Sequence, residues 1–287
     1  IFGPNCAVKV LNGILKRNLK TSIDLGFGVD TPPNPIIKQG WINIFNDDFN
    51  GSNLDLTKWK TNPHWLIPTA PFHPGNIKNN NEAPTHYYDA SCISVVNDKL
   101  VITTDYTPQT FHFVDWDGQD YGHWDVSYKT GWIQTLDRYK YGYFEIRSKM
   151  PKSKGQWPAF WLAGDPWPPE IDIYEIYTSK FDNRFESNYH WGIEGDEDFP
   201  HESDVGRHYI NNSTEEFHIY GCEWNECFIK WYYDNLLVRV AYKNVDLINI
   251  DMEVIVSSAI HDFENNLGSD GTYPNNYEVD YVRIYER

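Results

Sequence analysis

Residues 157–176 read Trp157-Pro-Ala-Phe-Trp-Leu-Ala-Gly-Asp-Pro-Trp-Pro-Pro-Glu-Ile-Asp-Ile-Tyr-Glu-Ile176. The end of this stretch sets three carboxylates, Glu170, Asp172 and Glu175, among isoleucine and tyrosine residues that favour strands. An acid on a largely apolar strand costs free energy unless it is paired or functional. The stretch therefore predicts a strand whose acids carry out chemistry.

The spacing of the three acids makes a structural prediction. Glu170 and Asp172 are two residues apart and share a strand face, whereas Glu175 is five residues from Glu170 and falls on the opposite face. A β-bulge adds one residue and restores the parity, and bulges occur beside active sites. We therefore predict a bulge around Ile173–Tyr174 that brings all three acids to one face.

Carboxylates gathered on one face are typical of glycosidases. A retaining glycosidase uses two carboxyl groups about 5–5.5 Å apart, one as nucleophile and one as acid/base. Repulsion between such close charges raises at least one pKa, which keeps an acid protonated near neutral pH. With 41 acids in 287 residues, about one match to Glu-x-Asp-x-x-Glu is expected by chance. The apolar setting and the preceding Trp157–Trp161 block favour the catalytic interpretation over a chance match.

The rest of the chain from Trp41 onward has the pattern of short strands. Tyr141–Met150 alternates between two faces, and Ile93–Val96 and Lys99–Thr104 predict a hairpin around Asn97-Asp98. Similar runs follow at Phe185–Trp191, Glu216–Trp224, Phe228–Tyr233, Leu236–Tyr242, Met252–Ile260 and Tyr277–Tyr285. These runs predict an all-β fold, a sandwich or a barrel.

We expect one catalytic domain over residues 41–287. Residues 1–40 have a weak mixed pattern and end in the proline-rich Thr31–Pro35, so they are interpreted as an N-terminal extension, either an arm or a short extra segment. Residues 60–90 and 106–128 are interpreted as long loops. The aromatic and acidic residues of 106–128 would either form a sugar-binding wall or fold back onto the core.

Composition excludes several classes of partner. The formal net charge is −17 and no cluster of basic residues offsets it, which argues against nucleic acid and anionic membrane surfaces and favours a neutral substrate over a sulfated one. No apolar run approaches the roughly 18 residues of a membrane span. Four cysteines form no Cys-x-x-Cys pair, which argues against a zinc site, and the pairing of Cys222 with Cys227 across a hairpin is left open.

Eight sequence blocks occur in a fixed order between about Asp47 and Tyr285. They are Asp48–Gly51 with Lys58-Trp59, Asn97–Ile102, Thr130–Ile133, Tyr141–Arg147, Gly155–Leu162, Glu170–Glu175, Phe217–Trp224 and Val279–Tyr285. In this order they resemble family 16 of the glycoside hydrolases, which includes laminarinases, lichenases, agarases and κ-carrageenases. The form Glu-x-Asp-x-x-Glu is similar to the bulged branch of that family.

The resemblance implies a concanavalin-like β-jelly-roll sandwich with a concave substrate cleft, and endo-acting cleavage of β-glycosidic bonds with retention. It assigns Glu170 as nucleophile, Glu175 as acid/base and Asp172 as the acid that holds the charge and proton balance of the nucleophile. A laminarin-type β-glucan is the first choice of substrate. The alternatives are a β-galactan of the agar, porphyran or carrageenan type, a transglycosylase, or a non-catalytic glycan-binding module, although such a module would be expected to lack one of the acids.

Five further residues are predicted to bind substrate: Trp132, Arg147, Trp157, Trp161 and His190. Core packing is the alternative for the tryptophans, a structural role for His190, and a surface ion pair for Arg147. No cofactor is required for the chemistry. Asp48 and Asp280 fall at positions that resemble a structural calcium site of the family, although calcium needs about six to eight oxygen ligands.

The chain departs from the family pattern at Pro169, at Tyr174 and at Asp48, where a glycine, a methionine and a glutamate are common. The segment Ser257–Phe263 also lacks the usual glycine-rich turn. These departures affect which substrate is expected and leave the assignment of the three acids unchanged. A polysaccharide substrate implies a secreted, cell-surface or periplasmic protein, and we expect a monomer.

Overall fold

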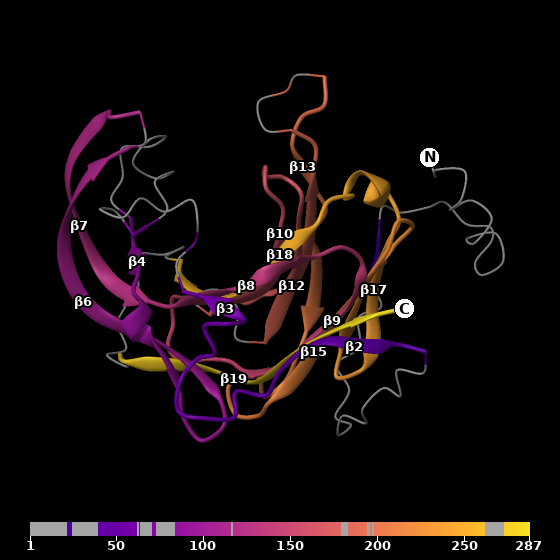
Figure 1. Ribbon diagram of the computed structural model, residues 1–287, viewed down its shortest axis with the longest axis horizontal. Coiled ribbons are helices and arrows are strands. Elements are labelled where there is room, and N and C mark those ends of the chain that lie inside the picture. Colours follow the sequence, from indigo (N-terminus) through magenta and orange to yellow (C-terminus); the bar gives the residue numbers. More distant parts are fainter. Residues whose placement is uncertain are drawn as a thin grey trace.

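A computed structural model describes residues 22–24, 40–61, 63, 71–72, 84–115, 117–178, 183–193, 196, 198–261 and 273–287. These residues form two β-sheets with two short 3-10 helices, η2 (Ala90–Cys92) and η3 (Val245–Leu247), and no α-helix within the described ranges. Figure 1 shows the strands stacked in two layers, with the long ribbon of β6 and β7 curving away on the left. The predicted all-β sandwich is confirmed.

The first sheet has eleven strands. In spatial order its main path is β1 (Ser22–Asp24), β17 (Leu236–Ala241), β16 (Ile229–Tyr233), β15 (His218–Trp224), β9 (Gly142–Lys149), β19 (Asn275–Glu286), β6 (Leu100–Val114), β7 (Asp120–Thr130) and β4 (His86–Tyr88). β2 (Ile42–Asp47) pairs with β19, and β5 (Ile93–Val95) pairs with β6. All pairs are antiparallel except that of β4 with β7.

The second sheet has eight strands and contains the acid-bearing strand near its centre. Its order is β13 (Glu202–Ser203), β12 (Arg184–Trp191), β11 (Glu170–Glu175), β10 (Gln156–Ala163), β18 (Met252–Ile260), β8 (Trp132–Tyr139) and β3 (Trp59–Lys60). β14 (Gly206–Tyr209) pairs with β12. β11 therefore lies between two full-length neighbours, which fix its register on both sides.

One large core lies between the two sheets. It takes alternate residues from both layers, such as Phe144 and Ile146 of β9, Phe160 and Leu162 of β10, and Tyr220 of β15. This alternation is the reason that the period-two pattern located the strands well. The hairpin turn at Asn97 and Asp98 is also as predicted, with φ of 52° and 55°, the left-handed values that a tight two-residue turn requires.

The interpretation of residues 106–128 as a loop is wrong. These residues form most of the β6–β7 ribbon, whose pairing shifts register between Tyr106 and Gln109 and again between His112 and Val114. The two irregularities break the strict alternation that would have revealed the strands. Phe113 and Val126 pack with Phe72 and Tyr87 in a small cluster separate from the main core. A sugar-binding wall on this ribbon stays a prediction.

Several sequence predictions concern residues outside the described ranges. Most of residues 1–40 and of the 60–90 region lie there, as does Cys6. Within residues 1–40, β1 adds an antiparallel strand to the edge of β17. The domain boundary near residue 41 stays a prediction.

The cysteines do not pair as the hairpin alternative proposed. Cys222 is buried and free, as is Cys92, whereas Cys227 is disulfide-bonded. Cys222 lies opposite Trp231 in the β15–β16 ladder, so its side chain belongs to the core between the sheets.

Substitution of Gly142 tests the close approach of β9 to β19 in the first sheet. Its φ is +127°, and a Cβ there would lie 2.5 Å from the backbone oxygen of Tyr285 on β19. We expect Gly142→Ala to lower the free energy of unfolding by about 2–4 kcal/mol, because strain and a backbone clash add.

The matched control is Gly118→Ala, at φ +81° with nothing within 4 Å of the added Cβ. It should cost only about 1 kcal/mol. Urea denaturation of both variants measures the difference, and equal losses would contradict the clash.

Candidate active site

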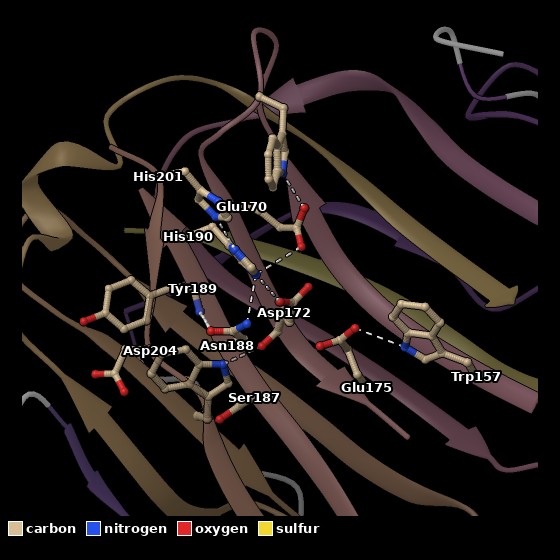
Figure 2. A network of polar contacts seen from close by, with 12 residues as sticks. Trp157, Glu170, Asp172, Glu175, Ser187, Asn188, Tyr189, His190, His201 and Asp204 are labelled. Atoms are coloured by element: carbon tan, nitrogen blue, oxygen red, sulfur yellow. Dashed lines mark hydrogen bonds and ion pairs between the residues drawn. The ribbon is translucent and has the colours of Figure 1, made fainter. Parts of the chain in front are cut away.

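All three carboxylates lie on the face of β11 that is turned away from the core. Ile171, Ile173 and Tyr174 of the same strand point into the core. The ladders place Glu170 opposite Ala163 and His190, Asp172 opposite Trp161 and Asn188, and Glu175 opposite Ala159 and Glu186. Figure 2 shows the three acids side by side along this face.

The predicted bulge is confirmed from both neighbouring strands. On β10, Phe160 pairs with Tyr174 and the next residue, Trp161, pairs with Asp172, which leaves Ile173 without a counterpart. On β12 the register shifts between Asp172 and Glu175 as well. The extra residue turns Glu175 back to the side of Glu170 and Asp172.

Glu170 is held by an indole hydrogen bond. Trp167 Nε1 donates to Glu170 Oε2 at 2.7 Å, from the proline-rich loop that leads into β11. Burial and then the charge of Asp172 raise the pKa of Glu170 well above its usual value, while His190 and the Trp167 hydrogen bond oppose this rise. The Glu170 side chain is 16% exposed, so one edge of it stays accessible.

Asp172 is the most buried of the three acids, at 2% exposure. Its Oδ2 has no hydrogen-bond partner and lies 3.4 Å from His190 Nε2. Its backbone oxygen accepts a hydrogen bond from Trp231 Nε1 at 2.9 Å, which ties β11 to the opposite sheet. Burial and then the charge of Glu175 raise the pKa of Asp172 well above its usual value.

Glu175 receives two hydrogen bonds on the same oxygen. Its Oε1 accepts from Trp157 Nε1 at 3.0 Å and from the Tyr177 hydroxyl at 3.2 Å. Because Oε1 accepts both bonds, a proton on this carboxyl group belongs on Oε2. Burial and then the charge of Glu170 raise the pKa of Glu175 to about 8, so the group is protonated at neutral pH.

His190 contacts two of the acids through one nitrogen. Its Nε2 lies 3.6 Å from Glu170 Oε1 and 3.4 Å from Asp172 Oδ2. Asn188 Oδ1 accepts the Tyr189 N–H, so the amide nitrogen of Asn188 faces His190 Nε2, at 2.9 Å. Nε2 then acts as an acceptor, and Nδ1 carries the hydrogen that is donated to His201 Nε2, also at 2.9 Å.

This imidazole is neutral at neutral pH. Burial lowers the pKa of His190 below its usual value, and the charge of Glu170 only partly opposes the effect. The His201 ring stacks on that of His190 with centroids 5.1 Å apart, and it also contacts Trp167. Figure 2 shows His190 beside Glu170 and Asp172, and His201 next to His190.

The structure corrects two of the predicted substrate-binding residues. Arg147 is on β9 of the other sheet, where it forms an ion pair with Asp280 at 2.6 Å, so it lies away from the acids. Trp132 is only 3% exposed and packs edge-on against Trp161, so its ring underlies Trp161 and offers no face to a sugar.

Trp157 and Trp161 share the face of the acids, as their spacing predicted, and both are partly buried. Trp161 Nε1 donates to Ser257 Oγ at 3.2 Å, while Trp157 binds Glu175 directly. Sugar stacking on these two rings stays a prediction. Trp167, Tyr177 and His201 were missed. Only Trp167 gave a signal, because it precedes Glu170 by three residues in the quoted stretch.

Asp48 and Asp280 each already have a cation, since Asp48 pairs with Arg283 at 2.8 Å and Asp280 with Arg147 at 2.6 Å. A calcium site at these two residues stays a prediction. Within the described part of the chain, the one group of three or more potential metal ligands is Glu170, Asp172 and His190, whose ligand atoms all lie within 4.8 Å of one another.

Comparisons with known proteins agree with this geometry. The sequence model described as glycosyl hydrolases family 16 matches residues 82–283. The endo-1,3-1,4-beta-glycanase EglC of Rhizobium meliloti is 31% identical over 253 residues, which cover 84% of this chain and 51% of that protein. The chain thus spans about half the length of the curated relative.

Two solved structures share the fold. One comes from work on endo-acting O-glycanases that members of the human gut microbiota express to initiate mucin breakdown, with a TM-score of 0.71, 26% identity and coverage of 87% of this chain and 92% of that one. The other is the catalytic domain of a laminarinase from Thermotoga petrophila RKU-1, with a TM-score of 0.66, 24% identity and coverage of 86% and 98%. Among the described residues, no helix is long and apolar enough to cross a membrane.

The raised pKa of Glu175 predicts how stability depends on pH. An unfolded glutamate ionises near its usual pKa of 4.5, whereas folded Glu175 keeps its proton up to about 8. Between these values ionisation favours the unfolded chain, so this group makes the free energy of unfolding fall as pH rises and has no further effect above about 8.

The variant Glu175→Gln removes the titration and nearly keeps the shape. We expect the free energy of unfolding of the variant to rise relative to that of the wild type as pH increases from about 4.5 to about 8. Urea denaturation followed by tryptophan fluorescence at several pH values measures this. Parallel curves for the two proteins would contradict a raised pKa at Glu175.

Proposed function

The chain belongs to family 16 of the glycosyl hydrolases, and from this premise we propose that it is a retaining endo-β-glycosidase acting on a laminarin-type β-glucan. The observation that carries the proposal is the meeting of three acids on one face of β11. One of them, Glu175, has a pKa of about 8, and another, Glu170, is partly exposed and bound by an indole N–H.

In the proposed reaction Glu170 is the nucleophile. Its carboxylate attacks the anomeric carbon and forms a covalent glycosyl-enzyme, while Glu175 gives its proton to the departing glycosidic oxygen. Glu175, now ionised, then takes a proton from water, and the resulting attack releases Glu170 and the sugar with retained configuration. The contacts of Trp157 and Tyr177 with Oε1 leave Oε2 of Glu175 for this proton.

The Glu170–Asp172 pair is proposed to keep one proton at neutral pH, and this proton is on Asp172. Two carboxyl groups this close do not both ionise, and the more deeply buried one pays more for its charge. We therefore assign the proton to Asp172 and the charge to Glu170, which has the Trp167 donor and greater exposure. When Glu170 becomes an ester its charge disappears, and Asp172 can ionise in turn.

A neutral glucan fits the charges that flank the acids. Arg184 and Arg207 share the carboxylate of Glu186, and Lys60 pairs with Glu253, so each of these cations already contacts a carboxylate. The similarity to an endo-1,3-1,4-beta-glycanase of Rhizobium meliloti supports β-1,3 or β-1,4 linkages in the substrate. An endo-acting hydrolase of mucin O-glycans is the second candidate, which the likeness to the gut O-glycanase structure favours.

We propose that the protein works outside the cytosol. Its disulfide at Cys227 supports this, because structural disulfides persist in oxidising compartments. Polymeric glucans and mucins are also met there.

Substrate and mechanism are tested together on laminarin, mixed-linkage glucan, agarose, κ-carrageenan and mucin. We expect the wild type to release reducing ends from laminarin in an endo pattern, and proton NMR to show the β-anomer first. Glu170→Gln should lose at least about 1,000-fold in kcat, because it removes the nucleophile.

The matched control is Glu186→Gln, on the same face of the adjacent strand and opposite Glu175. It should keep most of the activity. An inactive wild type on every polymer would contradict the enzyme proposal, and equal activity of Glu170→Gln would contradict the assignment of the nucleophile.

The rate should also depend on pH through Glu175. Because the acid must be protonated, kcat/KM is expected to fall as pH rises through about 8. The Tyr177 hydrogen bond stabilises the ionised form, so Tyr177→Phe should move this fall to higher pH. A pH–rate profile of both proteins measures the shift, and a shift to lower pH would show that Glu175 is not the titrating acid.

A further inference from the structure

Two carboxylate oxygens and one imidazole nitrogen lie close together where β11 pairs with β12. Glu170 Oε1 and Asp172 Oδ2 lie 3.6 Å and 3.4 Å from His190 Nε2, and the three ligand atoms lie within 4.8 Å of one another. Asp172 Oδ2 has no hydrogen-bond partner although its side chain is 3% exposed. We propose that these atoms form a site for a divalent transition-metal ion, best suited to Zn²⁺, which blocks the proposed nucleophile reversibly.

The separations fit a shared metal better than hydrogen bonds. Nitrogen–oxygen hydrogen bonds are about 2.7–3.2 Å long, and both distances to His190 Nε2 exceed that range. Tetrahedral zinc with ligands at about 2.0–2.1 Å places neighbouring ligand atoms about 3.3–3.4 Å apart. The two distances to Nε2 need shifts of only a few tenths of an ångström, whereas the Glu170 and Asp172 oxygens, which lie within 4.8 Å of each other, would have to close to about 3.4 Å. Three corners would then be filled, and the fourth would be open to water.

The outer contacts orient the ligands as they do in metal sites. Glu170 accepts the Trp167 hydrogen bond on Oε2, which leaves Oε1 directed at the site. His190 donates its Nδ1 hydrogen to His201, which leaves the lone pair of Nε2 for a ligand. A metal-bound histidine typically donates its other N–H in this way, and its carboxylate ligands are typically hydrogen-bonded too.

One present contact and one proton must give way, since Asp172 has to release the proton assigned to it when it binds the metal. The Asn188 amide lies 2.9 Å from His190 Nε2, in the direction that a metal would occupy. Its oxygen is held by the Tyr189 N–H, so only the amide nitrogen has to swing aside. The imidazole ligand favours zinc, copper or nickel over calcium and magnesium, which prefer oxygen ligands alone.

The consequence for activity rests on the proposed function. A metal bound to Glu170 Oε1 occupies the carboxylate that would attack the anomeric carbon, and its charge opposes that attack. Metal binding and catalysis are therefore mutually exclusive. The ion is an inhibitor that competes with substrate, and a chelator would restore activity.

Isothermal titration of the purified protein with ZnCl₂ tests the site directly. We expect one Zn²⁺ per chain, and a Co²⁺ complex with the intense visible absorption of tetrahedral coordination. His190→Gln should weaken binding more than about 100-fold, and His201→Ala about 10-fold because it removes an outer contact. Zn²⁺ should raise the apparent KM for laminarin, and EDTA should reverse this.

The matched control is His112→Gln. His112 stacks on His123 with centroids 4.6 Å apart on the exposed β6–β7 ribbon, which is a second place where imidazoles could chelate. This variant should bind Zn²⁺ like the wild type. Circular dichroism melting checks that each variant is folded.

Absence of binding at millimolar Zn²⁺, or binding that survives His190→Gln, would overturn the proposal. Loss of binding in His112→Gln alone would move the site to the ribbon and equally overturn it. A protein that binds Zn²⁺ through His190 but cuts no polymer would keep the metal site and refute the proposed function. Hydrolysis of laminarin that Zn²⁺ does not inhibit would keep the proposed function and refute the metal site.

Discussion

The bulge at Ile173 is the constraint on which the site depends. A regular strand would send Glu175 toward the core, where an ionisable group without partners costs several kcal/mol. With one extra residue, Ile173 and Tyr174 both enter the core and the three acids emerge on the same face. Both neighbouring strands shift register at this point, so the irregularity is built into the sheet and not confined to β11. Packing of two apolar residues in succession therefore determines where the chemistry is placed.

Burial and hydrogen-bond donors give the acids different properties. Burial raises the pKa of all three acids, yet the groups that offset the rise differ. They are His190 and then the Trp167 indole for Glu170, the Tyr177 phenol and then the Trp157 indole for Glu175, and the Glu170 side chain and then Arg239 for Asp172. Arg239 is fully buried between the sheets and donates to the backbone oxygens of Ser187 and Asp204. It fastens β12, which carries His190 and Asn188 opposite the acids, to the segment after β13.

Because the carboxyl groups of Glu170 and Asp172 lie close together, either a proton or a metal ion can occupy the space between them. Protons relieve the repulsion between the carboxyl groups in the proposed reaction, and a divalent cation would relieve it in the proposed inhibited state. His190 takes part in both, because its neutral Nε2 accepts a hydrogen bond or binds a metal. The orientation of that imidazole comes from His201 and Asn188 and not from the acids themselves.

The sequence by itself determined the strands, the bulge and the shared face of Trp157 and Trp161, because each follows from a period of two along one strand. That pattern left a sandwich or a barrel open, and the resemblance to family 16 indicated the sandwich. It could not find the β6–β7 ribbon, where two register shifts hide that period. It also placed Arg147 and Trp132 with the substrate, since one strand pattern says nothing about which sheet or layer a side chain joins. Only the tertiary structure showed that Trp167 and Tyr177 turn back onto the acids and that His201 meets His190. The first two contacts depend on how the chain bends at the ends of β11, and the third joins separate segments, so spacing along the chain does not fix them.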